Sequence, residues 1–303
     1  MSEAVPAQRR ALAVGLALIL VWGASFSIQK ACYAAMSPGG FLFFRSLLMS
    51  VLAVALMRFN GLPLWPRLDR ADWRLLIMCT LFGQVMHIGL VTYGIHLSTA
   101  FTSSVIMACG PVITLVLLRM LHGARLRLAQ LLGVAAALAG VLLFLADKLA
   151  NAEVRASRGD LLMLAGAALF SLYTIRVVPL LQRHGGTQVM CWTTLLAAPA
   201  MMAATAVPAF HSSWEQVPAH IWLAFVWSAT VSAFGGWLVW SWVNLVRGVA
   251  RTAPLLYLVP PVAGLIGWIW LGESLGPWKL LGAGVAMAGV AMVQWPGPRA
   301  SNH

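Results

Sequence analysis

The sequence contains little charge, and most of the charge it has is positive. Only 9% of its 303 residues are charged, with 8 acidic against 20 basic side chains. Soluble globular domains carry about 25% charged residues. Because 61% of the residues are hydrophobic, one water-soluble core cannot hide so much apolar surface. The composition therefore excludes an ordinary soluble globule and predicts a membrane protein.

Cysteine is also scarce, and the usual metal-binding spacings are missing. The four cysteines show no CxxC spacing, and three of them lie in apolar runs, so we expect them to be small packing residues. They are Cys32, Cys79, Cys109 and Cys191. The zinc-protease pattern HExxH does not occur. We therefore expect no disulfide framework, no metal site and no cofactor.

Ten long apolar stretches follow one another along the chain. A bilayer core about 30 Å thick needs about 20 apolar residues per helix. Stretches of this kind are predicted at residues 10–29, 38–58, 74–96, 99–119, 127–146, 160–182, 187–207, 219–243, 252–271 and 276–295. Since the connections are short, no soluble domain fits between them. The expected fold is all-α, a polytopic membrane protein with ten transmembrane helices.

The distribution of basic residues predicts an orientation. With a cytoplasmic N-terminus, thirteen basic residues fall inside and five outside, the bias that the positive-inside rule describes. An even number of spans puts the C-terminus in the cytoplasm as well. The predicted location is the inner membrane of a bacterium, with the lipid bilayer as a partner. The net charge of +12 then needs no nucleic acid partner to explain it.

A proline recurs at the same place in both halves of the chain. A shift of 149 residues places Pro111 on Pro260 and Gly133 on Gly282. This indicates a duplication of five spans, and because five is odd the second copy enters the membrane inverted. We expect a five-plus-five inverted repeat. Its parts are a first repeat at 1–146, an external linker at 147–159 and a second repeat at 160–303.

The paired prolines are candidates for a substrate path. Proline inside a helix frees backbone carbonyls, and within a membrane this is tolerated only where the carbonyls face protein or a wet cavity. Pro111, Pro260 and its neighbour Pro261 are therefore predicted helix breaks that could act in gating. The alternative is that each one only kinks a helix against its neighbours.

Several motifs resemble those of a known family. They are "WGASFSIQK" (22–30), Arg45 in "FFRSLL", "VPPVAGLIGWIWLGESL" (259–275) and the Gly-rich "LLGAGVAMAGV" (280–290). Together they are similar to the EamA-type family of the drug/metabolite transporter superfamily, and in particular to its exporters of amino acids, aromatic ones included. This resemblance implies a ten-helix inverted-repeat exporter that works by alternating access through a midplane cavity.

A few polar groups lie among aromatic and methionine residues in the predicted spans, a mixture that suits a small amphipathic substrate. The candidate substrate-binding residues are His87, Tyr93, Ser103, Met107, Tyr173, Trp237, Trp240 and Tyr257. Ionisable groups inside a membrane are costly. For Arg45 we expect a structural charge that snorkels or bonds a loop carbonyl. For Glu273 we expect a structural charge that caps the ninth span or pairs with a lysine such as Lys30.

The sequence thus predicts a membrane transporter, not an enzyme, that exports small amphipathic metabolites. Amino acids are the favoured substrate class, and drugs or nucleobases are the alternative. A membrane-embedded enzyme is the alternative from another class. The pairs Gly133-x3-Ala137 and Gly282-x3-Ala286 let helices approach closely, but the oligomeric state does not follow from them.

Overall fold

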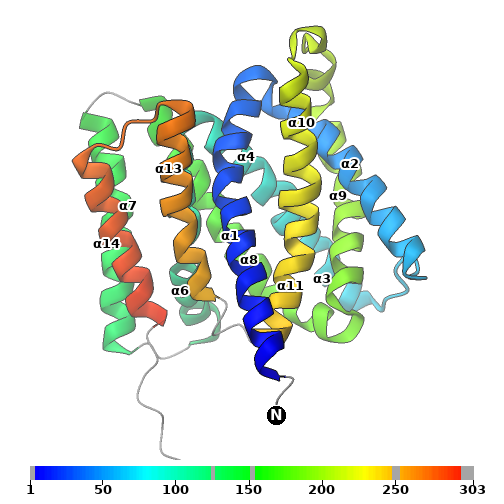
Figure 1. The fold of residues 1–303 in the computed structure, drawn as a ribbon. Helices are drawn as coiled ribbons and strands as arrows, with labels where there is room; N and C mark the ends of the chain where they lie inside the picture. The colour runs from blue at the N-terminus through cyan, green and yellow to red at the C-terminus, as the bar shows by residue number, and fades with distance from the viewer. Residues whose placement is uncertain (1–3, 124–126, 151–153, 248–252, 295–303) are drawn as a thin grey trace, which may run out of the picture.

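The computed structural model describes residues 4–123, 127–150, 154–247 and 253–294, which form a bundle of helices without strands (Figure 1). The first half contains α1 (Ala4–Ala35), α2 (Pro38–Phe59), α3 (Arg70–Cys79), α4 (His87–Leu97), α5 (Ala100–Ala108), α6 (Gly110–His122) and α7 (Leu128–Ala150). The second half contains α8 (Val154–His184), α9 (Gly186–Phe210), α10 (Ala219–Trp227), α11 (Gly236–Arg247), α13 (Val259–Leu271) and α14 (Pro277–Gln294).

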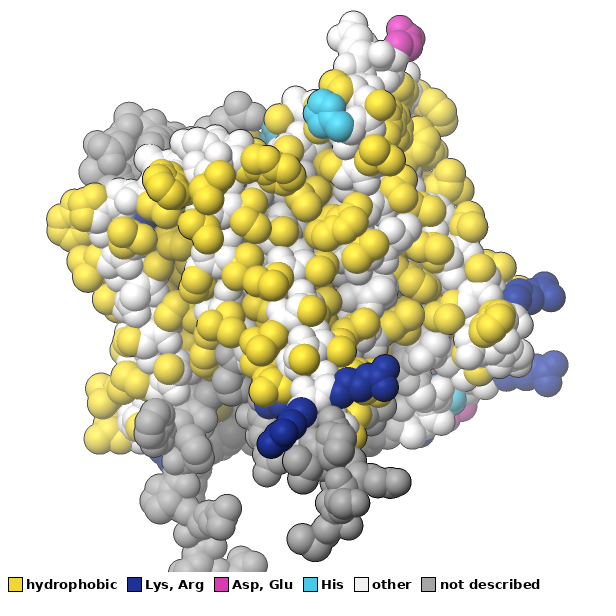
Figure 2. Space-filling view, viewed as in Figure 1, with side chains coloured by type: hydrophobic (Ala, Val, Ile, Leu, Met, Phe, Trp, Pro, Cys, Tyr) yellow, Lys and Arg dark blue, Asp and Glu magenta, His cyan; other side chains and the backbone are white. Residues whose placement is uncertain are grey.

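Each of the ten predicted stretches coincides with a helix or with consecutive helices. Among the described residues, seven helical segments are long and apolar enough to cross a membrane, judged by length and composition. Three shorter apolar helices occupy the remaining stretches, at Leu128–Leu143, Leu255–Leu271 and Pro277–Val293. Figure 2 shows hydrophobic side chains over the middle of the visible face, with Lys and Arg toward the end where the N-terminus lies. The chain is an integral membrane protein of all-helical fold.

Both recurring prolines begin a new helical segment. Pro111 is the second residue of α6, and Pro260 is the second residue of α13, which follows the 3₁₀ segment η4 (Ala253–Leu258). The first turn of a helix has no use for the N–H that proline lacks, so the penalty of a mid-helix proline does not arise. One helical segment thus gives way to the next just before Pro111 and Pro260, at the starts of α6 and α13.

The two proline-led helices match in length and in their ends. Both α6 and α13 are 13 residues long. Each is followed by a glycine in the left-handed conformation, Gly123 with φ 65° and Gly272 with φ 64°. Glycine populates this region without the steric penalty that a Cβ would bring. The two glycines are related by the same 149-residue shift as the prolines.

Helices that correspond under this shift pack against each other in antiparallel fashion. On α7 and α14, Gly133 lies against Gly289, and Gly140 lies against Gly282 and Ala286. Because the numbering rises on one helix as it falls on the other, the pair runs in opposite directions. Figure 1 shows α7 and α14 side by side at one end of the bundle, with α2 and α9 at the other end.

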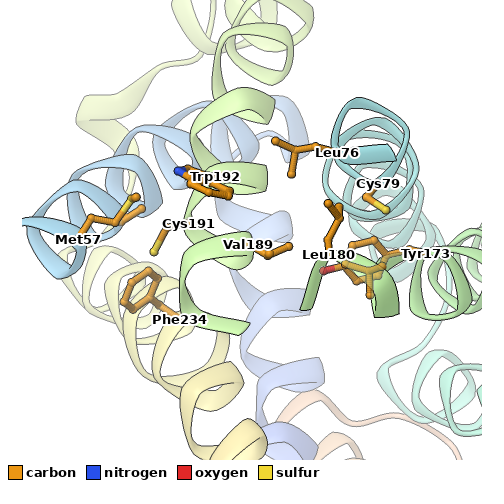
Figure 3. Packing of buried hydrophobic residues seen from close by; sticks show 11 residues of the cluster. Met57, Leu76, Cys79, Tyr173, Leu180, Val189, Cys191, Trp192 and Phe234 are labelled. Carbon is orange, nitrogen blue, oxygen red and sulfur yellow. The ribbon is translucent and has the colours of Figure 1, made fainter. Parts of the chain in front are cut away.

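The α2–α9 pair is also antiparallel. Gly39 near the start of α2 lies against Pro208 near the end of α9. Met57 near the end of α2 shares a buried cluster with Cys191 near the start of α9. Figure 3 shows this cluster, which joins α2 and α9 to α3, α8 and the segment η3 (Ser228–Gly235). All four cysteines are free and buried, which confirms their predicted role as packing residues.

Two helices that cross the bundle contain a π-helical segment, and the sequence did not predict either one. The segment η1 (Thr80–Met86) lies between α3 and α4, and η3 (Ser228–Gly235) lies between α10 and α11. Their first residues are 148 positions apart, close to the repeat shift. A π turn inserts an extra residue and changes the direction of the side chains that follow, and such segments recur at functional sites.

Candidate functional site

A pocket lies between α2, α9 and the segment formed by η1 and α4. The space between their side chains that protein atoms leave empty, including space open to the surroundings, is about 350 Å³. Its lining residues recur at helical spacing on each element, and they are Leu42, Arg45, Ser46, Met49, Gln84, Ile88, Thr194, Ala197, Ala198 and Met201. Each of the three helical elements thus presents one row of side chains to the pocket. The pocket is mainly apolar, with a few polar groups, as is typical of sites for small molecules.

The polar side chains of the pocket fall into two kinds. Ser46 and Thr194 donate their hydroxyls to backbone carbonyls one turn earlier in their own helices, those of Leu42 and Met190. Such bonds are common for hydroxyls inside membrane helices and leave the oxygen lone pairs available. The Arg45 guanidinium and the Gln84 amide, by contrast, are donors that no hydrogen bond among the described residues engages.

An aromatic cluster adjoins η1 and α4. The His87 ring stacks on Phe170 with centroids 4.9 Å apart, and Phe170 stacks on Tyr173 at 6.0 Å. Trp237 meets the Phe170 ring edge-on at 5.8 Å. His87 Nδ1 lies 2.9 Å from the Gly166 carbonyl oxygen, and since a carbonyl can only accept, Nδ1 carries a proton. The cluster combines α4, α8 and α11 around one phenyl ring.

A chain of hydrogen bonds connects η3 with α1. The Ser232 hydroxyl donates to Ser25 Oγ at 2.8 Å, and the Gln29 amide donates to the same oxygen at 2.8 Å. The Tyr33 hydroxyl donates to Gln29 Oε1 at 2.8 Å. Trp22 Nε1 donates to the Ser232 carbonyl at 3.0 Å. Polar side chains on one face of α1 thus bind a π-helical segment of the other half of the chain.

The structure brings some predicted site residues together and separates others. His87, Tyr173 and Trp237 share the aromatic cluster, and Trp240 packs on Trp22 with centroids 5.2 Å apart. The others lie elsewhere. Tyr93 is 40% exposed beside Gly39, and Ser103 is fully buried without a hydrogen-bond partner among the described residues. Met107 packs with a cluster around Phe41, and the Tyr257 hydroxyl donates to the Val290 carbonyl at 3.2 Å.

The prolines differ in their surroundings. Pro260 is buried and Pro261 is exposed, whereas Pro111 is half-buried. The carbonyl of Gly110, at the break before Pro111, accepts a hydrogen bond from the Ser171 hydroxyl at 3.2 Å. A backbone group at the break is thus bound by α8 of the other half of the chain. This contact satisfies the carbonyl inside the bundle, as a membrane interior requires.

Glu273 caps a helix of the opposite half, a partner that the sequence did not reveal. Its carboxylate accepts hydrogen bonds from the backbone N–H groups of Ala100 at 2.6 Å and Phe101 at 3.2 Å, at the start of α5. Lys30 donates instead to the carbonyls of Ile95, His96 and Ser98. The expected cap on its own helix and the expected pair with Lys30 are therefore replaced by a cap on α5.

We expect Glu273→Gln to lower the stability of the folded protein by about 1 kcal/mol, because it removes a negative charge from a helix N-terminus. The measurement is the thermal unfolding midpoint of the purified protein in detergent. Glu215→Gln is the matched control, because Glu215 is an exposed acid in the 3₁₀ segment Trp214–Gln216. Equal midpoints for the two variants would show that the cap contributes nothing.

Asp69 and Asp72, the two acidic residues closest to each other in the sequence, have structural roles. Asp69 accepts a hydrogen bond from the Asp72 backbone N–H at 2.7 Å and so caps α3. Asp72 itself is buried and pairs with Arg183 at 2.6 Å and His184 at 2.8 Å on α8. Among the described residues, no group of three His, Cys, Asp or Glu side chains could hold a metal ion. The acidic pair thus fastens α3 to α8.

Some residues of the site lie outside the sequence-based candidates. Phe170, Ser46, Thr194 and Met201 were not predicted. Each is an ordinary residue for a membrane helix, and only the packing of α2, α8 and α9 brings it to the site. Helical spacing from Arg45 would have identified Ser46 and Met49, but not the residues of the facing helix.

Comparison with known proteins agrees with this architecture. The chain matches the EamA-like transporter family over residues 9–146 and again over residues 157–295. It is 28% identical, over 81% of each chain, to a protein of Streptantibioticus cattleyicolor named "Probable terminal-alkyne amino-acid exporter". It is 25% identical to a "Probable amino-acid metabolite efflux pump" of Salmonella typhimurium, over 91% of this chain and 92% of that one.

A solved crystal structure shares the fold. It has a TM-score of 0.62 at 20% identity and covers 94% of this chain and 97% of its own. The two family matches together span most of the chain, one on each side of the break between α7 and α8. The chain belongs to the EamA-like transporter family.

Proposed function

We propose that the protein exports small amphipathic metabolites, with amino acids, including aromatic ones, as the main class, by alternating access across the inner membrane of a bacterium. The observation that carries the proposal is the pocket between α2, α9 and η1–α4, which is apolar apart from a few polar groups. Family membership and the names of the two relatives support export of amino acids. We propose His87, Tyr173, Trp237 and Trp240 as substrate contacts beside this pocket.

A counterflow screen tests the function. Purified protein in liposomes is loaded with one unlabelled amino acid, nucleoside or dye, and uptake of the same labelled compound is measured. Export of amino acids predicts transient accumulation of labelled phenylalanine or leucine. Accumulation of only dyes or nucleosides would support the drug or nucleobase alternative. Release of a chemically changed product without accumulation would instead indicate an enzyme.

The transport cycle needs a scaffold with two related halves. We propose ten membrane spans in a five-plus-five inverted repeat, with repeats at 1–146 and 160–303 joined by an external linker at 147–159. The antiparallel packing of α7 on α14 and of α2 on α9 supports this arrangement, because a two-fold axis in the membrane plane reverses corresponding helices. Residues 151–153 of the linker lie outside the described residues.

Cysteine labelling tests the orientation. With both termini in the cytoplasm, Asn60→Cys lies on the cytoplasmic side and Arg158→Cys on the outer side, and both positions are exposed. A membrane-impermeant thiol reagent added to whole cells is expected to label only Arg158→Cys. The four native cysteines are buried and serve as the unlabelled background. Labelling of both variants in intact cells would contradict the inverted repeat.

A further inference from the structure

Arg45 is a charged group of α2 that has no hydrogen-bond or ion-pair partner among the described residues. It is the eighth residue of α2, about 10 Å along a helix that rises 1.5 Å per residue. An arginine within a membrane span is unfavourable by about 2.5–3.5 kcal/mol at the helix centre on insertion scales. Its side chain lines the pocket. Within the part of the chain that the structure describes, it makes no hydrogen bond and no ion pair.

Three acids among the described residues are engaged elsewhere, and no acid lines the pocket. Asp72 pairs with α8, Asp160 accepts a hydrogen bond from the Ser98 hydroxyl, and Glu273 caps α5. Tyr33 and His87 are titratable groups near enough to Arg45 to interact with it electrostatically. Neither is an anion near neutral pH, because an ordinary tyrosine ionises near pH 10 and histidine is neutral or cationic. The pocket therefore holds a positive charge that no protein carboxylate lining it balances.

Gln84 adds a second set of unused donors to the same pocket. It belongs to η1, and it lines the pocket together with Ile88 of α4. Its amide makes no hydrogen bond to the described residues. A guanidinium presents paired N–H groups in the fork geometry that a carboxylate accepts, and an amide N–H can add a third bond.

The other residues that line the pocket limit which anion can bind beside Arg45. They form mostly apolar walls and include Leu42, Met49, Ile88, Ala197, Ala198 and Met201. Burying a phosphate monoester, with nearly two negative charges, beside one arginine would leave charge unbalanced, and buried charges need pairing. A carboxylate with one charge pairs with Arg45, and an apolar side chain of the same molecule can contact these walls. The ammonium group of an amino acid then needs water or a carbonyl oxygen as its own partner.

We propose that Arg45 and Gln84 bind the carboxylate of the transported molecule, so that the substrates are carboxylate-bearing amphipathic molecules and not their amides or amines. This proposal rests on the proposed transport function and assigns one end of its substrate. Arg45 forms a bidentate charge-assisted pair with the carboxylate, and Gln84 donates to one of the same oxygens. The bound substrate supplies the counter-charge that the residues lining the pocket do not provide.

The test compares two probes of the same size in proteoliposome counterflow, phenylalanine and phenylalaninamide. Wild-type protein is expected to exchange phenylalanine and to exchange the amide far less. Arg45→Gln should lower the apparent affinity for phenylalanine at least about tenfold, because hydrogen bonds to charged groups are strong, and Arg45→Lys should retain part of it. Arg176→Gln is the matched control, since Arg176 is an exposed arginine of α8 away from the pocket lining.

A charge placed beside Arg45 gives a second, independent test. Gln84→Glu supplies an internal carboxylate that pairs with Arg45, so the protein is expected to fold while its exchange of phenylalanine falls and that of phenylalaninamide rises. Binding is followed separately as the rise in unfolding temperature on adding each probe. Phenylalanine should stabilise the wild type and the Arg176→Gln variant, and it should not stabilise Gln84→Glu.

The outcomes separate this proposal from the transport function. If wild-type protein exchanges neither probe nor any other solute of the screen, the transport function fails. If wild-type protein exchanges phenylalanine and its amide equally well, or Arg45→Gln and Gln84→Glu exchange phenylalanine like the wild type, transport stands and the carboxylate site is wrong. Preferential exchange of a phosphate ester would assign Arg45 to another anion and would also overturn the proposal.

Discussion

Gly289→Ala is expected to lower the unfolding temperature of the protein sharply and to reduce the amount that folds in the membrane. A Cβ at this position would lie 2.4 Å from the Ala137 backbone nitrogen and 2.5 Å from the Gly133 carbonyl oxygen. Both atoms belong to the backbone of α7 and cannot rotate away. Since helix association in membranes depends on close packing of small residues, α7 and α14 would have to separate.

The expected loss of stability in Gly289→Ala follows from the measured effects of adding methyl groups to packed interiors. Extra methyl groups in a packed interior lower stability by typically about 1–3 kcal/mol, and contact with backbone puts this site at the upper end. Gly284→Ala, also on α14, is the matched control because its Cβ would meet nothing within 4 Å. Alanine is a better helix former than glycine, so the control should be as stable as the wild type or slightly more stable. Equal losses in both variants would exclude the packing explanation.

The sequence predicted the helices well because hydrophobic length is a strong signal in membrane proteins. The predicted stretch at 38–58 corresponds to α2 at Pro38–Phe59, and the one at 276–295 corresponds to α14 at Pro277–Gln294. The pairs of small residues also pointed to close packing, since Gly133 and Gly282 both lie in the α7–α14 contact. Such features depend on one helix and its own pattern, which a sequence displays directly.

Partners across the bundle could not be predicted in the same way. Glu273 binds backbone N–H groups that lie more than 170 residues away in the chain, and backbone donors leave no mark in a sequence. The π-helical segments contain no residue that distinguishes them from ordinary membrane helix in the sequence. The sequence grouped Gln84 with His87 on one span, and the structure adds that Gln84 lines the pocket facing α2 and α9.

The candidate substrate-binding residues also show what could not be predicted from the sequence. The mixture of polar and aromatic groups selected His87 and Tyr257 on equal terms. In the structure His87 joins the cluster around Phe170, whereas the Tyr257 hydroxyl bonds to α14. Which side of a helix faces a cavity depends on the rotation of that helix and on the elements packed against it. Amino-acid composition does not contain this information.

The second large effect is expected at the aromatic cluster. Trp237→Ala and His87→Ala should each lower exchange of phenylalanine in proteoliposomes about tenfold while leaving membrane insertion unchanged. Trp237 covers the edge of Phe170, and His87 covers its face at 4.9 Å. Removing either ring takes away apolar contact area with a polar tip, which is the combination that binds an amphipathic solute.

Tyr257→Phe is the control for this prediction, because it removes only a hydroxyl that donates to the Val290 carbonyl of α14. It should exchange phenylalanine like the wild type, with at most a small loss of stability from the missing hydrogen bond. Insertion is compared by the yield of folded protein after gel filtration. If Tyr257→Phe lost exchange while Trp237→Ala and His87→Ala kept it, the substrate would lie on the α13–α14 side of the bundle. The Phe170 cluster would then be packing that holds α4, α8 and α11 together.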